Sequence, residues 1–146
     1  MESRINIFEL EPKAYSALLA FETYLQSSPL KKTHKELIKI RASQINGCAY
    51  CIDMHTKDAM KHGETAQRLF LLNAWRETNL FTEEEKAILA LTEEVTYIHK
   101  SGVSNEAYQA AEKLFDKNYL ALIVLMIVAI NSWNRISVTC QSQPAS

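Results

Sequence analysis

Two cysteines and a histidine recur at helical spacing in the first half of the chain. Cys48 and Cys51 are three residues apart, and His55 follows four residues later. Residues at those spacings share one face of a helix, and Cα atoms three residues apart are separated by roughly 5 Å. A disulfide accepts that separation. The pair can therefore be oxidised while the helix stays folded, and a loop this small serves reversible chemistry better than stability.

Two residues that can transfer protons, Glu36 and His55, lie at nearly equal numbers of residues before and after a predicted turn. An imidazole can accept or relay a proton near neutral pH. The pair Asn46-Gly47 is a turn signal, with Glu36 ten residues before Asn46 and His55 nine residues after it. A helical hairpin about this turn predicts that Glu36 lies beside His55. The four groups would then form one proton path, in the order Glu36, His55, Cys51 and Cys48.

The position of Cys48 favours an ionised sulfur. It is predicted in the first turn of its helix, where free backbone N–H groups and the helix dipole stabilise a thiolate. A thiol with a pKa of about 8.5 is only a few per cent ionised at pH 7, and lowering that pKa to about 7 makes it half ionised. The sequence gives the direction of this effect and not its size.

Helical periodicity dominates the chain and predicts an all-α bundle of about seven helices, with the cysteine pair at the start of a central helix. Apolar residues recur at intervals of three and four, and no alternating strand pattern of useful length is present. Pro, Ser and Thr mark helix starts, and Gly marks helix ends. The predicted helices are 12–26, Thr33 (cap) to 46, 48–62, one after Thr65, one from Thr82 through Ile98, one after Ser104, and 119 to about 138.

Bulk composition narrows the class of protein. A chain of 146 residues, 47% hydrophobic and 23% charged, fits one soluble domain over residues 1–146. The net charge of −1 predicts no nucleic-acid partner. The N-terminus lacks the apolar stretch of a secretory signal, and the apolar run 119–130 is shorter than the ~20 residues of a membrane span. We therefore expect no membrane association and a cytoplasmic, reducing location, where a close cysteine pair is catalytic or metal-binding more often than structural.

The pattern Glu-x11-Cys-x-x-Cys-x3-His, filled by Glu36, Cys48, Cys51 and His55, resembles the active-site signature of the AhpD-like alkylhydroperoxidases. These proteins belong to the carboxymuconolactone decarboxylase superfamily. The segment Asn131-Ser-Trp-Asn-Arg135 is similar to that family's Asn-x-Trp-Asn-Arg segment on its last long helix. The resemblance spans residues 33–138, and we expect the second segment to satisfy buried polar groups or to order an interface.

The resemblance implies a thiol peroxidase. In the family, the second motif cysteine, here Cys51, attacks a hydroperoxide, and the first, here Cys48, resolves the sulfenic acid to a disulfide. Glu36 and His55 manage the protons, and a lipoyl-bearing or thioredoxin-like thiol reductant restores the dithiol. The family assembles as homo-oligomers, trimers or hexamers. No cofactor or metal is expected.

Other interpretations stay open. Some family peroxidases carry a second histidine just before the second cysteine, and here that place is Tyr50, whose phenol donates a hydrogen bond but is no neutral-pH base. A general disulfide oxidoreductase or a redox sensor is therefore an alternative, as is a lactone decarboxylase. A zinc site would use Cys48, Cys51 and His55, with His62, Cys140 or Glu36 as fourth ligand. Cys140 itself is expected to be an incidental thiol in the tail.

Overall fold

The computed structural model describes residues 4–146. Within these residues the backbone forms helices and no strand, as predicted. The helices are α1 (Ile7–Leu10), α2 (Pro12–Gln26), α3 (Lys32–Asn46), α4 (Ala49–Lys61), α5 (Ala66–Phe70), the 3₁₀ helix η1 (Leu72–Glu77), α6 (Glu83–Thr96), α7 (Ile98–Ser101), α8 (Asn105–Leu114) and α9 (Lys117–Cys140).

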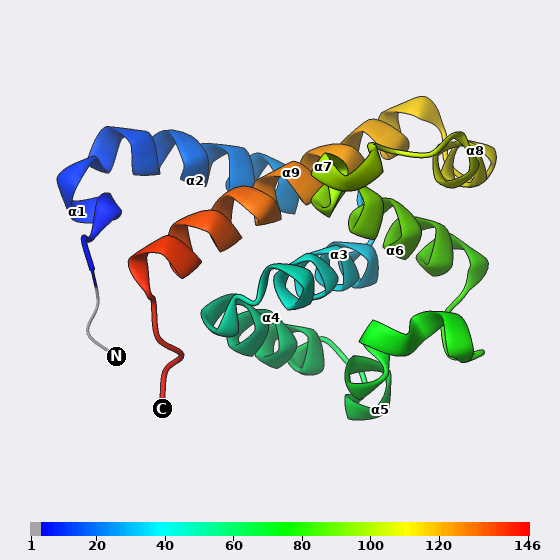
Figure 1. Cartoon of the computed structure of the whole chain (residues 1–146), viewed down its shortest axis with the longest axis horizontal. Coiled ribbons are helices and arrows are strands. Elements are labelled where there is room, and N and C mark those ends of the chain that lie inside the picture. The colour runs from blue at the N-terminus through cyan, green and yellow to red at the C-terminus, as the bar shows by residue number, and fades with distance from the viewer. Residues whose placement is uncertain (1–3) are drawn as a thin grey trace.

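Helix α3 is the centre of the bundle (Figure 1), packed against α4, α6 and α9. Two apolar clusters lie on different sides of it. Ile38 and Ala42 contribute to the cluster shared with α6 and α9, whereas Leu37 and Ile40 contribute to the cluster shared with α4 and η1. Since so much of α3 is covered, its polar residues are buried too: His34, Lys35, Glu36, Lys39 and Ser43.

Side-chain caps begin several helices where the sequence predicted them. The hydroxyls of Thr65 and Ser104 accept the N–H groups that start α5 and α8. Thr82 and Glu85 form the reciprocal capping box of α6, which satisfies two backbone donors at once. These signals are local, so they can be identified without knowledge of the tertiary structure.

Other boundaries differ from the prediction because tertiary contacts set them. Thr33 is no N-cap: α3 begins at Lys32, and the N–H of Lys31 before it donates to the Tyr119 hydroxyl at 2.9 Å. Glu36 is therefore not a capping residue. The last long helix starts at Lys117, capped by Asp116, rather than at Tyr119.

Three short elements were not predicted as separate helices, namely α1, η1 and α7. Each has six residues or fewer, too few for an apolar period to show. Thr96 ends α6, so the predicted helix through Ile98 is two helices. The helix after Thr65 ends at Phe70, and Leu72 lies in η1.

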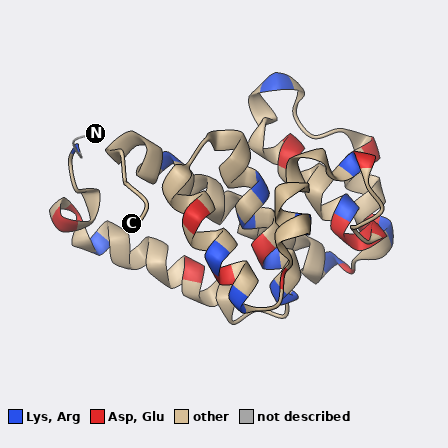
Figure 2. Ribbon diagram, turned by 90° about the horizontal axis from the view of Figure 1, so that it is seen from below, with Lys and Arg blue, Asp and Glu red and all other residues tan. Residues whose placement is uncertain are grey.

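The two ends of the described chain meet. The backbone N–H of Arg4 donates to the Cys140 carbonyl at 3.2 Å, which ties the segment before α1 to the end of α9 on one side of the molecule (Figure 1). Figure 2 shows basic and acidic residues interspersed along the helices. Phe8 of α1 packs against Trp133 of α9, with ring centroids 6.0 Å apart, and both residues line the site described next.

Candidate active site

A tight hairpin between α3 and α4 presents the cysteine pair. Gly47 ends α3 with a φ of 65°, in the left-handed region that glycine enters at little cost. The N–H of Cys48 then donates to the Ser43 carbonyl at 3.0 Å. Cys48 is the N-cap of α4 rather than its first residue, so its sulfur is directed at the helix start.

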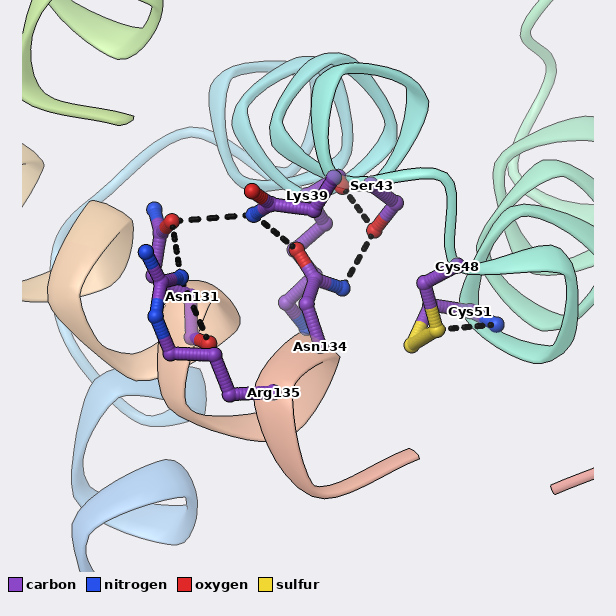
Figure 3. Close-up of a disulfide and its surroundings, with 8 residues drawn as sticks. Lys39, Ser43, Cys48, Cys51, Asn131, Asn134 and Arg135 are labelled. Atoms are coloured by element: carbon purple, nitrogen blue, oxygen red, sulfur yellow. Dashed lines mark hydrogen bonds between the residues drawn. A yellow bond between two sulfur atoms is a disulfide. The ribbon is translucent and has the colours of Figure 1, made fainter. Parts of the chain in front are cut away.

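Cys48 and Cys51 form a disulfide (Figure 3). Their Cα atoms are 5.3 Å apart, in agreement with the helical spacing expected from the sequence. The N–H of Cys51 donates to the Cys48 sulfur at 3.3 Å, and both residues are 1% exposed. Because the free N–H of the first turn already points at this sulfur, it is also placed to stabilise a thiolate on Cys48.

The Asn-x-Trp-Asn-Arg segment holds the end of α3 in place (Figure 3). The Asn46 side-chain amide donates to the Oδ1 atoms of Asn131 and Asn134 at 2.9 and 3.0 Å. Asn134, which is fully buried, donates to the Ser43 hydroxyl at 2.9 Å. Arg135 donates to Asn131 at 2.8 Å. The predicted role of this segment in satisfying buried polar groups is therefore confirmed, and the groups lie beside the turn into Cys48.

Cys51 opens onto a largely apolar cavity of about 520 Å³. The cavity is formed by the N-terminal segment, α2, the first turns of α4 and the end of α9. Cys48 does not line it. The lining residues are Arg4, Ile5, Asn6, Ile7, Phe8, Tyr15, Leu19, Glu22, Tyr50, Cys51, Met54, His55, Trp133, Ile136, Ser137, Cys140 and Ser142. Of the two cysteines, Cys51 thus borders the cavity and Cys48 does not.

His55 lines the same cavity one helical turn after Cys51. It is 8% exposed. Burial, reinforced by the nearby Lys39 ammonium, lowers the pKa of His55 to about 4, against the weaker opposing effects of Glu22 and Asp58. The imidazole is therefore neutral at physiological pH and can accept a proton.

Glu36 lines a second, polar cavity of about 310 Å³ with Lys32, Ala59 and His62, and among the described residues no hydrogen bond joins it to His55. Its Oε2 atom is buried without a hydrogen-bond partner, and burial raises the pKa of its carboxyl group. Counting residues from the turn predicts that Glu36 lies beside His55. In the structure Glu36 shares a cavity with Ala59, which is one helical turn beyond His55, and a direct proton path between Glu36 and His55 stays a prediction.

The carboxylate in the cavity of Cys51 is Glu22 of α2, which was not predicted. Its Oε1 atom pairs with the Lys39 ammonium of α3 at 3.0 Å, and its Oε2 atom accepts the Trp133 indole N–H at 3.3 Å. Burial by itself would raise the pKa of Glu22, but Lys39 and these hydrogen bonds hold it below its usual value. The one signal in the sequence is an acidic residue inside the apolar stripe that contains Phe21 and Leu25.

Tyr50 and Cys140 also line this cavity. Tyr50 is 37% exposed, and its accessory role stays a prediction. Cys140 was expected in the tail but is the last residue of α9 and is a buried free thiol. For the zinc alternative, residues 4–146 contain no group of three or more His, Cys, Asp or Glu side chains placed to hold a metal ion.

The fold and site define an all-helical protein with a cysteine-pair disulfide beside a histidine. Residues 12–94 match the carboxymuconolactone decarboxylase family. An uncharacterized Bacillus subtilis protein, YdfG, is 44% identical over 146 residues, which is all of this chain and 99% of that protein. The chain therefore belongs to the carboxymuconolactone decarboxylase family, and its AhpD-like character is supported by two solved structures.

The first of these structures is a protein of unknown function from Agrobacterium tumefaciens, provisionally assigned as the antioxidant defence protein AhpD. It is 40% identical, with a TM-score of 0.96 over 99% of both chains. The second is an AhpD-core, peroxidase-related protein from Ralstonia eutropha JMP134. At 18% identity and a TM-score of 0.82, over 95% of this chain and 74% of that one, it shows the shared fold.

Proposed function

We propose that the protein reduces organic hydroperoxides through a dithiol–disulfide cycle of Cys48 and Cys51. The observation that carries the proposal is that Cys51, and not Cys48, lines the apolar cavity together with His55. Membership of a peroxidase-related family supports the same class of reaction. The cavity favours an organic hydroperoxide over hydrogen peroxide because its walls are mostly apolar side chains.

In the proposed cycle, neutral His55 accepts the Cys51 thiol proton. The thiolate attacks the terminal peroxide oxygen, the O–O bond breaks, and the alkoxide leaves as the alcohol after taking a proton from His55. Cys51 is then a sulfenic acid. Cys48 attacks its sulfur, the S–O bond breaks, water leaves and the disulfide forms. A dithiol reductant returns two electrons and two protons.

Glu36 enters the proposal as a more distant proton group. The pKa of its carboxyl group is raised, which makes proton exchange nearer neutral pH possible. Lys39 acts electrostatically on both Glu36 and His55, so the two groups lie in one electrostatic neighbourhood without direct hydrogen bonding. Glu36 in this role passes protons between His55 and the polar cavity, away from the substrate.

The reductant, the location and the assembly are also proposals. A lipoyl arm fits the apolar route to Cys51 better than a folded thioredoxin-like domain does, because the cavity of about 520 Å³ admits a slender chain. We keep a cytoplasmic location and a homo-oligomer, a trimer or hexamer, as the expectations that accompany this function.

The test is titration of free thiols before and after addition of cumene hydroperoxide, followed by peptide mass spectrometry. The reduced wild type should lose two thiols per chain and gain the Cys48–Cys51 bridge. Cys51→Ser should lose none, and Cys48→Ser should stop at a Cys51 sulfenic acid that dimedone traps. Cys140→Ser serves as the matched control and should behave as the wild type. Unchanged thiols in the wild type under excess hydroperoxide would reject the proposal.

The alternative function, a lactone decarboxylase, would not require the two cysteines. The matched family carries that activity in its name, and loss of carbon dioxide from a carboxylated lactone uses no disulfide. A Cys48→Ser/Cys51→Ser double variant that decarboxylates such a lactone at the wild-type rate would favour this alternative.

A further inference from the structure

The ion pair of Glu22 and Lys39 lies at the boundary between the apolar cavity and the protein core. The Lys39 side chain is 5% exposed and the Glu22 side chain 18%. Glu22 comes from α2 and lines the cavity with Cys51 and His55, whereas Lys39 comes from the buried helix α3. A buried ion pair of this kind gives little net stability, because desolvation opposes the attraction between the charges.

The surroundings hold Glu22 in one orientation. Its Oε1 atom accepts hydrogen bonds from Lys39 at 3.0 Å and from the Gln26 amide at 2.9 Å, and its Oε2 atom accepts the Trp133 N–H at 3.3 Å. Trp133 belongs to the same helical segment as Asn131 and Asn134, which hold the turn before Cys48. One segment of α9 thus positions both the carboxylate and the cysteine hairpin.

We propose that Glu22 is a positioning residue for the thiol chemistry: it balances the buried Lys39 charge that acts on His55, and so sets the pH at which Cys51 ionises. This inference rests on the proposed function, since it takes Cys51 as the attacking thiol. Glu22 acts through Lys39 and His55 and exchanges no proton itself. The motif residue Glu36 also lies in the field of Lys39, but Glu22 is the carboxylate that pairs with Lys39 and lines the cavity of Cys51.

The charged and titratable groups around the site come from every element packed there. His55 lies in the electrostatic field of Lys39, Glu22 and Asp58. The other ionisable groups nearby are Arg4, Tyr15, Tyr50 and Cys140 in the cavity wall and Glu36 on α3. Lys39 is the cation that acts on His55 from the core. The charge of Glu22, its ion-pair partner, therefore decides how much of that positive charge remains uncompensated.

Removing the charge of Glu22 and removing the charge of Lys39 should therefore shift the pKa of the Cys51 thiol in opposite directions. In Glu22→Gln the uncompensated ammonium favours the thiolate and lowers the pKa of the Cys51 thiol. In Lys39→Met the uncompensated carboxylate disfavours the thiolate and raises that pKa. The double variant Glu22→Gln/Lys39→Met has neither charge and should return toward the wild-type value. A purely structural role would give shifts unrelated to the sign of the removed charge.

The experiment measures the alkylation rate of Cys51 by iodoacetamide against pH, in a Cys48→Ser/Cys140→Ser background that leaves one thiol. We expect a midpoint about one pH unit lower for Glu22→Gln, which is a roughly tenfold change in thiolate at acidic pH, and a similar rise for Lys39→Met. Glu22→Asp should keep the parent midpoint. Glu93→Gln, which removes the carboxylate paired with Arg41 at 3.0 Å, is the matched control and should also leave it unchanged.

Midpoints that move in the same direction for both single variants, or that stay within about 0.3 pH unit of the parent, would overturn the proposal. If Glu22→Gln does not fold, as judged by circular dichroism, Lys39→Met and the double variant still decide the sign. Alkylation requires no hydroperoxide. A protein that fails to reduce hydroperoxides but shows the opposite shifts would reject the proposed function alone, and an active peroxidase without those shifts would reject this inference alone.

Discussion

His55 is neutral because the protein buries it, and this has a thermodynamic consequence. The pKa of its imidazole is about 4 in the folded protein, against 6.5 for an unperturbed histidine. Between those values the unfolded chain binds a proton that the folded chain does not, so stability increases with pH across this range. The same burial that keeps the base unprotonated for catalysis therefore makes the fold sensitive to acid.

We predict that the free energy of unfolding falls by roughly 3 kcal/mol as the pH is lowered from 6.5 to 4, through His55 alone. His55→Gln has no imidazole to titrate and should lack this part of the pH dependence. Urea unfolding of both proteins at half-unit pH steps measures the difference. Equal slopes for wild type and variant in this range would contradict the prediction.

Glu36 is a second buried titratable residue, with the opposite linkage. The pKa of its carboxyl group is raised above 4.5, so ionisation of Glu36 destabilises the folded state. This loss of stability is absent below pH 4.5 and develops as the pH rises through the pKa that Glu36 has in the folded protein. Glu36→Gln should therefore raise the Tm at pH 8 and leave it nearly unchanged at pH 4.5. If Glu36 passes protons for the site, the same variant should slow hydroperoxide turnover. A lower Tm of Glu36→Gln at pH 8 would contradict the prediction that the ionised Glu36 carboxylate destabilises the folded protein.

At the scale of elements, α9 organises the site through one turn of polar residues. Asn131 and Asn134 bond to Asn46 at the end of α3, and Trp133 bonds to Glu22 of α2. These contacts link α9 to α2 and α3, which lie far from it in sequence. The helix therefore contributes both apolar packing to the core and the polar contacts that fix the cysteine turn.

Removing one of these polar contacts should be costly. Asn134→Ala leaves the half-buried amide of Asn46 and the buried hydroxyl of Ser43 short of a partner, so we expect a loss of about 1–3 kcal/mol in the free energy of unfolding. Ser132→Ala, a neighbour on α9 whose hydroxyl bonds only within its own helix, should change it by less than about 0.5 kcal/mol. Equal effects of the two changes in urea unfolding would show that the network is not stabilising.

At the scale of the whole molecule, α9 is only partly covered. It is long and apolar enough, by length and composition, to cross a membrane, the one such helix in residues 4–146, and 39% of its most apolar window is buried. Within the chain, Leu125 and Val128 of this helix stay 38% and 45% exposed. The absence of membrane association stays a prediction.

If a second copy of the chain covers this face, the purified protein should sediment as a multiple of 16.6 kDa. A Leu125→Lys/Val128→Lys variant should then sediment as a single chain, because charges on an apolar interface are costly to desolvate. Leu114→Lys, an exposed position on α8, is the control and should keep the wild-type mass. A monomeric wild type would remove the expectation of a homo-oligomer.

Local signals predicted much of this architecture. The bounds of α2 and the caps at Thr65, Thr82 and Ser104 depend on neighbouring residues, so the sequence was sufficient for them. The starts of α3 and α9 were misplaced by two residues, because Tyr119 and Asp116 bond to backbone groups there. The single-domain organisation of residues 1–146 remains a prediction.

For the site, the sequence by itself determined that Cys48 and Cys51 can form a disulfide, and that His55 lies one turn beyond Cys51. One helix sets both relations through its fixed rise and period. Which carboxylate shares the cavity of Cys51 was decided only by tertiary structure. Glu22 reaches it from another helix, while Glu36 lies against a different cavity, and contacts between helices depend on packing angles and register that residue spacing does not encode.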